Sequence, residues 1–203
     1  MSEPVSCVPD DFCKHIDDGS LISYTPNMEL AETFDNWVQK LDLTCATGSQ
    51  IGALGSVYFS GWVFSLIFLP RIADLYGRYL IIVLVNFASV LATIMILATH
   101  SYGFMLAALF IQGACVTGVL TLSLLYLYEN MQRDRYTSCL AVCFFAEGVM
   151  LIYVSFYFNF MSKNWLGAVL PFSIGGMVAA VISATYFLES PRYLVKTCQW
   201  DRL

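Results

Sequence analysis

Five long apolar stretches constrain the fold of this sequence more than any other feature. They lie at residues 51–70, 79–99, 103–128, 136–162 and 164–188. Only the fourth contains a charged residue, Glu147. Because an α-helix rises about 1.5 Å per residue, roughly 20 residues cross the ~30 Å hydrocarbon core of a bilayer. A soluble helical domain would need polar faces at helical spacing, which these stretches lack. The sequence therefore predicts an all-α membrane protein with five transmembrane helices.

Charge divides the chain into three parts. Residues 1–50 contain nine acids and two lysines, so we expect them to form an acidic arm. Residues 51–188 form the predicted five-helix transmembrane domain, and residues 189–203 form a short tail. An acidic arm argues against nucleic acid and anionic lipid surfaces as partners of this segment, because both attract basic clusters. The arm also lacks the basic start and apolar core of a targeting peptide.

The distribution of Lys and Arg predicts the orientation. Segments 70–78, 129–135 and 189–203 contain seven of these residues, whereas the segments on the opposite side of the predicted membrane contain three. Basic residues collect on the cytoplasmic side of membrane proteins. We therefore expect the arm outside and the C-terminus inside, as an odd number of spans requires.

The first predicted inside loop, PRIADLYGRY at residues 70–79, contains a turn with charges on both sides. Gly77 permits a tight turn, and Asp74 can accept from a helix N-terminus or pair with an arginine. The segment resembles the loop G-x-x-x-D-R-x-G-R-R between helices two and three of the major facilitator superfamily. It keeps Asp74, Gly77 and Arg78, and it departs at Pro70, Leu75 and Tyr79.

Two further inside segments extend the resemblance to residues 41–203. LESPRYLVK at 188–196 is similar to the P-E-S-P-R-W-L segment after helix six of sugar porters and organic ion transporters. Its matching residues are Glu189, Ser190, Pro191 and Arg192. YLYENMQRDRY at 126–136 resembles the glutamate and arginine pattern between helices four and five, carried here by Glu129 with Arg133 or Arg135. The segments NWVQKLDLTC, AEGVML and NWLGAVLP place the resemblance closest to organic cation and anion transporters.

This alignment makes the five spans helices two to six of a twelve-helix fold, an incomplete N-terminal half. Carriers of this superfamily rock two halves around a site at the bilayer midplane. We therefore expect an accessory or scaffold subunit of a larger membrane complex that does not transport alone. The alternative is a component of a split or oligomeric transporter for organic ions or sugars. The expected partners are other membrane subunits or the missing half. The resemblance implies the plasma membrane, and a mitochondrial inner membrane would suit a former transporter half.

Two polar residues inside the spans are candidates for a cavity. Glu147 lies about 16 Å along its span by helical rise, and a charged acid near mid-bilayer costs roughly 2.5–3.5 kcal/mol. Such residues face a cavity or a partner. Glu147 therefore either binds a cation or proton or makes a structural hydrogen bond to a neighbouring span or subunit. Gln112 is a second candidate, although bonding between helices is the simpler explanation of this residue. Glycines indicate close helix contacts by the same reasoning, at positions 48, 52, 55, 61, 113 and 118.

Cysteine and histidine provide little for catalysis. Cys7, Cys13 and Cys45 lie on the predicted outer side, where a disulfide can persist, and three cysteines form one pair and leave one thiol. The sequence does not decide which pair forms. His15 and His100 are isolated, so no metal site is expected. No phosphate loop, nucleophile elbow or zinc-protease motif occurs, and we expect neither an enzyme nor a cofactor.

Overall fold

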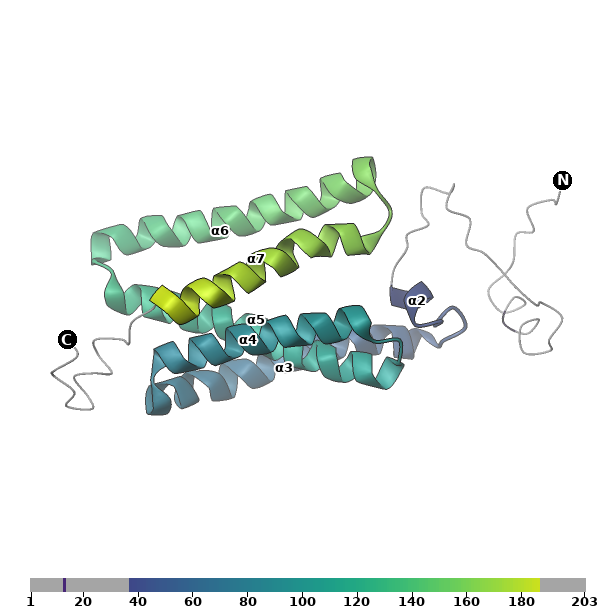
Figure 1. Ribbon diagram of the computed structural model, residues 1–203, viewed down its shortest axis with the longest axis horizontal. Coiled ribbons are helices and arrows are strands. Elements are labelled where there is room, and N and C mark those ends of the chain that lie inside the picture. The colour runs from purple at the N-terminus through teal and green to yellow at the C-terminus, as the bar shows by residue number, and fades with distance from the viewer. Residues whose placement is uncertain (1–12, 14–36, 187–203) are drawn as a thin grey trace.

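The computed structural model describes Cys13 and residues 37–186, which form a bundle of long antiparallel helices (Figure 1). A short helix, α2 (Trp37–Lys40), precedes α3 (Gly48–Tyr76), α4 (Arg78–Ala98) and α5 (Tyr102–Asn130). Next come α6 (Arg133–Phe156), a π-helix η1 (Tyr157–Met161) and α7 (Trp165–Tyr186). The five predicted spans are confirmed as five helices long and apolar enough to cross a membrane.

The helix boundaries follow from local chemistry. Gly77 alone separates α3 from α4 and has φ 100°, a conformation that side chains other than glycine rarely adopt. At the start of α3, the Gln50 side chain accepts a hydrogen bond of 2.9 Å from the backbone N–H of Thr47. Helix α3 continues past Pro70 to Tyr76, beyond the predicted end of the first span. Proline removes one backbone donor but does not end this helix, a tolerance that neighbouring helices give membrane segments.

Helices α3, α4 and α5 form the tightly packed part of the bundle. Gly61 and Gly113 let α3 and α5 approach closely, because a Cβ at Gly61 would meet the Phe110 carbonyl and one at Gly113 the Tyr58 carbonyl. Two apolar clusters fill the spaces among these helices. One contains Leu54, Ile96, Met105 and Leu109, and the other contains Ala73, Ile82, Val85 and Leu122. We call the end of the bundle near α2 the arm end and the end near Gly77 the loop end.

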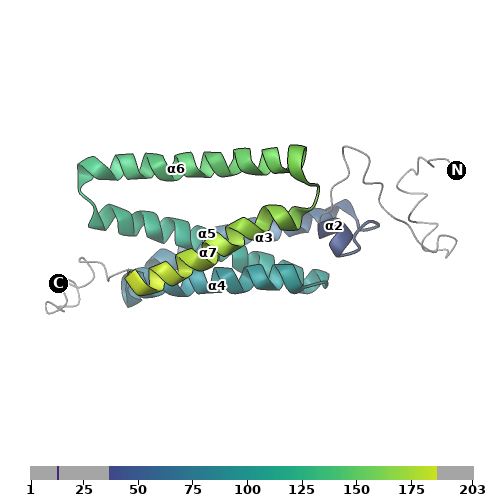
Figure 2. The ribbon, with the colours of Figure 1, turned by 45° about the horizontal axis from the view of Figure 1, so that its top comes forward.

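Helix α7 crosses over α4, whereas α6 stands at the edge (Figure 2). The Tyr79 hydroxyl donates to the Ala184 carbonyl at 3.0 Å and ties α4 to α7 near the loop end. Helix α6 contacts α7 near the arm end, where Tyr153 meets Phe172 edge-on at 5.4 Å. The Tyr157 hydroxyl of η1 packs on Gly167 of α7. Residues 141–147 of α6 are all exposed in the bundle.

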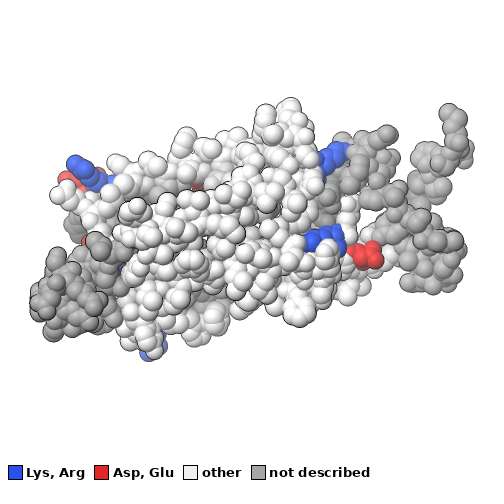
Figure 3. Space-filling model, in the orientation of Figure 1, with Lys and Arg blue, Asp and Glu red and all other residues white. Residues whose placement is uncertain are grey.

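The surface agrees with a membrane location. On the face shown in Figure 3, charged side chains gather toward the two ends of the molecule, and the broad band between them is almost free of charge. Large exposed apolar side chains occupy the helices in this band, among them Phe64, Ile67, Leu84 and Leu151. Exposed apolar area of this extent is expected where lipid is the solvent. The chain is an integral, multi-pass membrane protein.

Candidate functional site

Three charged residues converge at the loop end. Arg78 begins α4, and its Nη1 lies 2.7 Å from Oε2 of Glu129 at the end of α5. Its Nη2 lies 3.0 Å from Oδ1 of Asp74 in the last turns of α3. The guanidinium therefore joins the ends of three consecutive spans.

The two ion pairs differ in their exposure to solvent. The Glu129 side chain is 2% exposed and the Arg78 side chain 13%, whereas the Asp74 side chain is 54% exposed. A charge removed from water needs its partner, and leaving it unpaired costs several kcal/mol. An exposed pair contributes about 0–1 kcal/mol. The Arg78–Glu129 pair is thus the stronger structural tie, and it holds α4 against α5.

The other inside-loop candidates are not gathered around this site by anything in the described residues. Arg135 is exposed in the first turn of α6, and of Arg133 only its place at the start of α6 is described. Glu189, Ser190, Pro191 and Arg192 lie outside the described residues. Sequence reasoning grouped Glu129 with these arginines of the next helix. Arg78 was also a candidate, but its pairing with Glu129 was not predicted because that contact depends on how α4 and α5 pack.

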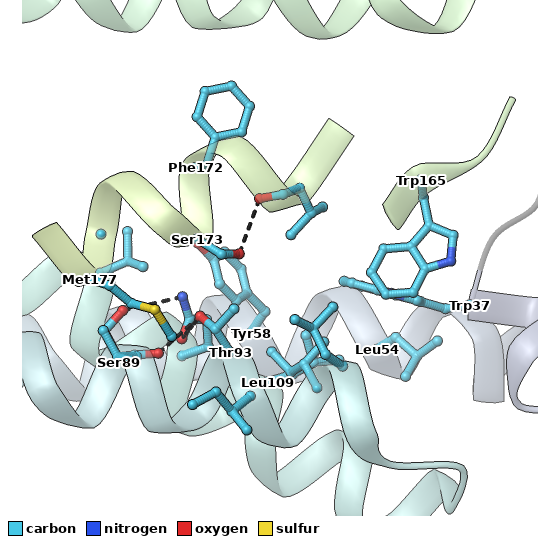
Figure 4. A pocket seen from close by; sticks show the side chains of 18 of the residues that line it. Trp37, Leu54, Tyr58, Ser89, Thr93, Leu109, Trp165, Phe172, Ser173 and Met177 are labelled. Carbon is cyan, nitrogen blue, oxygen red and sulfur yellow. Dashed lines mark hydrogen bonds between the residues drawn. The ribbon is translucent and has the colours of Figure 1, made fainter. Parts of the chain in front are cut away.

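A cavity of about 560 Å³ lies among α3, α4, α5 and α7 (Figure 4). Its wall is mostly apolar and aromatic, and none of its described lining residues is Asp, Glu, Lys or Arg. Five of its lining residues have amide or small hydroxyl side chains, and these are Asn86, Ser89, Thr93, Gln112 and Ser173. An apolar hollow with a few polar groups is the usual form of a small-molecule site.

Gln112 is at the centre of the polar part. Its Nε2 donates to Ser89 Oγ at 3.4 Å, and its Oε1 accepts from Thr93 Oγ1 at 3.4 Å. Both distances exceed the usual 2.7–3.2 Å range for such bonds. The Thr93 hydroxyl also donates to the Ser89 carbonyl at 2.9 Å. Because a hydroxyl has one proton, the shorter bond competes with the one to Gln112, and the amide is held weakly.

The arm end of the cavity is covered by the short helix α2. Trp37 and Trp165 both line the cavity, and their rings meet edge-on at 5.8 Å. Lys40 Nζ donates to the carbonyls of Ile96 and Leu97 at 2.9 and 2.7 Å and lies 5.5 Å from the Trp165 ring centroid. Desolvation by burial lowers the pKa of Lys40 from its usual value. These contacts attach α2 to the ends of α4 and α7.

The structure pairs Cys13 with Cys45, with 5.5 Å between their Cα atoms, and Cys7 lies outside the described residues. The disulfide links two parts of the arm, Cys13 and the segment just after α2. Sequence reasoning did not single out Trp37 or Trp165. Each follows an asparagine in the quoted segments NWVQKLDLTC and NWLGAVLP, and that repeated Asn-Trp pair was a usable signal.

Glu147 is not where a cavity residue was expected. It is exposed on α6 and does not line the cavity, because α6 packs only lightly against the other helices. Gln112, the second candidate, does line it. Within the described ranges, His, Cys, Asp and Glu form no group able to hold a metal ion.

Comparison with protein families matches residues 12–197 to the Major Facilitator Superfamily. The chain belongs to the major facilitator superfamily. This is a superfamily of membrane transporters, and the five antiparallel spans fit part of its fold. No individual curated protein matches the chain.

Proposed function

We propose that the chain is a component of a major facilitator carrier and that the cavity around Gln112 holds an organic solute during transport. The cavity carries this proposal. Its volume of about 560 Å³ lies within the ~300–1,000 Å³ of typical ligand pockets. Four spans of the same bundle contribute to its wall. We favour apolar or aromatic organic solutes over sugars. Most of the wall is apolar and cannot form hydrogen bonds with the hydroxyl groups of a sugar.

Transport in this superfamily rocks two helical bundles around a shared site. The described helices supply one such bundle, and we propose that a second one, from the same carrier assembly, completes the path. The Arg78–Glu129 and Arg78–Asp74 pairs support this view. They tie α3, α4 and α5 at one end, and a bundle that moves as a rigid body needs such ties.

We place the arm on the exoplasmic side and the C-terminus in the cytoplasm. Two independent observations support this orientation. Seven of the ten Lys and Arg residues fall in the sequence segments that join or follow the loop-end ends of the spans. The Cys13–Cys45 disulfide lies on the arm side, and disulfides persist in oxidising compartments. The plasma membrane satisfies both observations, and a mitochondrial inner membrane is the second candidate.

An accessory or scaffold subunit is the second candidate function, and helix α6 favours it. None of the most apolar part of this helix is buried within the chain. Its large apolar side chains include Phe144, Phe145, Leu151 and Ile152. Glu147 in the same helix would gain from a hydrogen-bonding partner in another membrane subunit. In this role the chain would bind partners through α6, and the cavity would have no solute.

Filling the cavity tests the proposed function against this alternative. Gly176 lines the cavity and Gly175 does not, and a Cβ at either position has no neighbour within 4 Å. We expect Gly176→Phe to abolish saturable solute uptake by cells expressing the carrier and its partners, while Gly175→Phe keeps it. Both variants should insert equally. Equal uptake by the two variants, or uptake in neither the wild type nor the variants, would favour the scaffold.

A further inference from the structure

We infer that the cavity selects an uncharged, elongated solute with a carboxamide-type head and an aromatic or apolar body. This inference rests on the proposed function and specifies its solute class. It follows from the position of the polar groups in the cavity, from the absence of charge in its described wall, and from the weak hydrogen bonds of Gln112. Each feature limits the solute in a different way.

The ends of the cavity differ in chemistry. Figure 4 shows Trp37 and Trp165 at one end and Ser89 and Thr93, the two partners of Gln112, toward the other. Phe172 and Tyr58 add aromatic surface to the wall. Aromatic rings pack well against flat apolar groups. A solute that fills this space therefore has a polar head at Gln112 and a ring or chain that reaches the tryptophans.

The wall excludes a charged head. An ion taken from water into a largely apolar site needs an opposite charge or, for a cation, an aromatic face. The described lining contains no Asp, Glu, Lys or Arg. Trp37 and Trp165 lie at the opposite end of the cavity from the partners of Gln112. Lys40 does not supply such a charge, because it is not among the residues that line the cavity. Glu147 lies outside the cavity on α6. The cavity wall therefore favours a solute whose head group is uncharged.

The amide of Gln112 favours a solute head group that both donates and accepts a hydrogen bond. Its Nε2 and Oε1 each have a 3.4 Å bond that a closer ligand group can replace. A carboxamide offers a carbonyl to Nε2 and an N–H to Oε1, so both atoms of Gln112 gain a partner. A carboxylate would face Oε1 with a negative oxygen, and an ammonium would leave Nε2 unmatched. A carboxamide therefore makes two bonds where either ion makes one.

Four probes that share one biphenyl body test this inference on the purified full-length chain. They are biphenyl-4-carboxamide, biphenyl-4-carboxylate, biphenyl-4-methylammonium and 4-methylbiphenyl. Quenching of tryptophan fluorescence reports binding, since Trp37 and Trp165 line the cavity. We expect the carboxamide to bind roughly tenfold more tightly than the other three, the amount that two modest hydrogen bonds supply.

Substitutions at Gln112 test whether this residue causes the preference for the carboxamide probe. Gln112→Leu should lower carboxamide affinity about tenfold and leave 4-methylbiphenyl affinity unchanged. Asn159→Leu, which also replaces an amide by leucine but lies outside the cavity, should alter neither affinity. Gln112→Asn keeps the amide but shortens its reach, and it should lose most of the preference even if the leucine variant does not fold.

The possible failures are distinct. Equal binding of carboxamide and 4-methylbiphenyl, tighter binding of either ion, or an unchanged preference in both Gln112 variants overturns the inferred solute class and leaves the cavity as a solute site. Binding of none of the four probes overturns the inferred class and also counts against the proposed function.

Discussion

Arg78 at the start of α4 contacts Glu129 at the end of α5 at 2.7 Å, and the carboxylate side chain is only 2% exposed. The same guanidinium reaches the exposed Asp74 at 3.0 Å. One arginine therefore bridges a buried and a solvated acid. This arrangement makes the loop end of the α3–α5 unit sensitive to loss of a single charge.

Glu129→Gln should destabilise the chain by about 3 kcal/mol, the low end of the cost of breaking a buried ion pair, because Arg78 keeps some exposure. Asp74→Asn should cost less than about 1 kcal/mol, since its pair is exposed. Thermal unfolding in detergent, followed by helical circular dichroism, measures both. Equal losses in the two variants would show that burial does not distinguish the pairs.

Lys40→Met should detach α2 from the ends of α4 and α7. The variant loses two hydrogen bonds to carbonyls and the contact with the Trp165 ring, and bonds to a charged group contribute about 1.5–3 kcal/mol each. We expect the emission of Trp37 and Trp165 to shift toward that of water-exposed tryptophan. Lys40→Arg keeps the charge and should resemble the wild type. An unchanged spectrum in the methionine variant would mean that Lys40 does not hold α2.

Gly113→Ala should weaken the contact between α3 and α5 by roughly 1–3 kcal/mol, because its Cβ would meet the Tyr58 carbonyl and overpack the interface. Gly52→Ala is the matched control on α3, where a Cβ has no neighbour within 4 Å. That change should be neutral or stabilise by about 0.4–1 kcal/mol. Unfolding in detergent measures the stability of both variants. Equal losses of stability would contradict the explanation by packing.

Glu147→Gln should leave probe binding in the cavity within about twofold of the wild type, the scatter expected for a change distant from the site. It should reduce the recovery of partner subunits after gentle detergent extraction, because a membrane-embedded carboxyl usually has a partner. Native sizing with identification of the co-purifying chains measures the second effect. Loss of probe binding with full recovery of partners would place Glu147 at the solute site instead.

The spans themselves could be predicted from the sequence because lipid imposes one rule on a crossing helix, a long apolar run. The turn at Gly77 was also accessible, since few residues other than glycine adopt its backbone angles. Helix ends were less accurate. Helix α3 passes Pro70 because contacts along the rest of the helix outweigh one missing hydrogen bond.

Contacts between spans could be predicted only in part. Of the glycines expected at close helix contacts, 61, 113 and 118 have close neighbours, whereas 48, 52 and 55 have none within 4 Å. A glycine signals that close approach is permitted, but the rotation of each helix decides whether it occurs. The same limit applies to the cavity. Gln112 stood out as a polar residue in an apolar run, whereas Ser89, Thr93 and Ser173 did not, because small hydroxyl residues are common within spans.

The most direct test of the central claim is the structure of the purified chain in a lipid nanodisc, with all co-purifying subunits and saturating biphenyl-4-carboxamide. We predict that the probe occupies the space among α3, α4, α5 and α7, with its amide within hydrogen-bonding distance of Gln112. A protein helix or a lipid acyl chain filling that space, with the probe bound elsewhere or absent, would contradict the account.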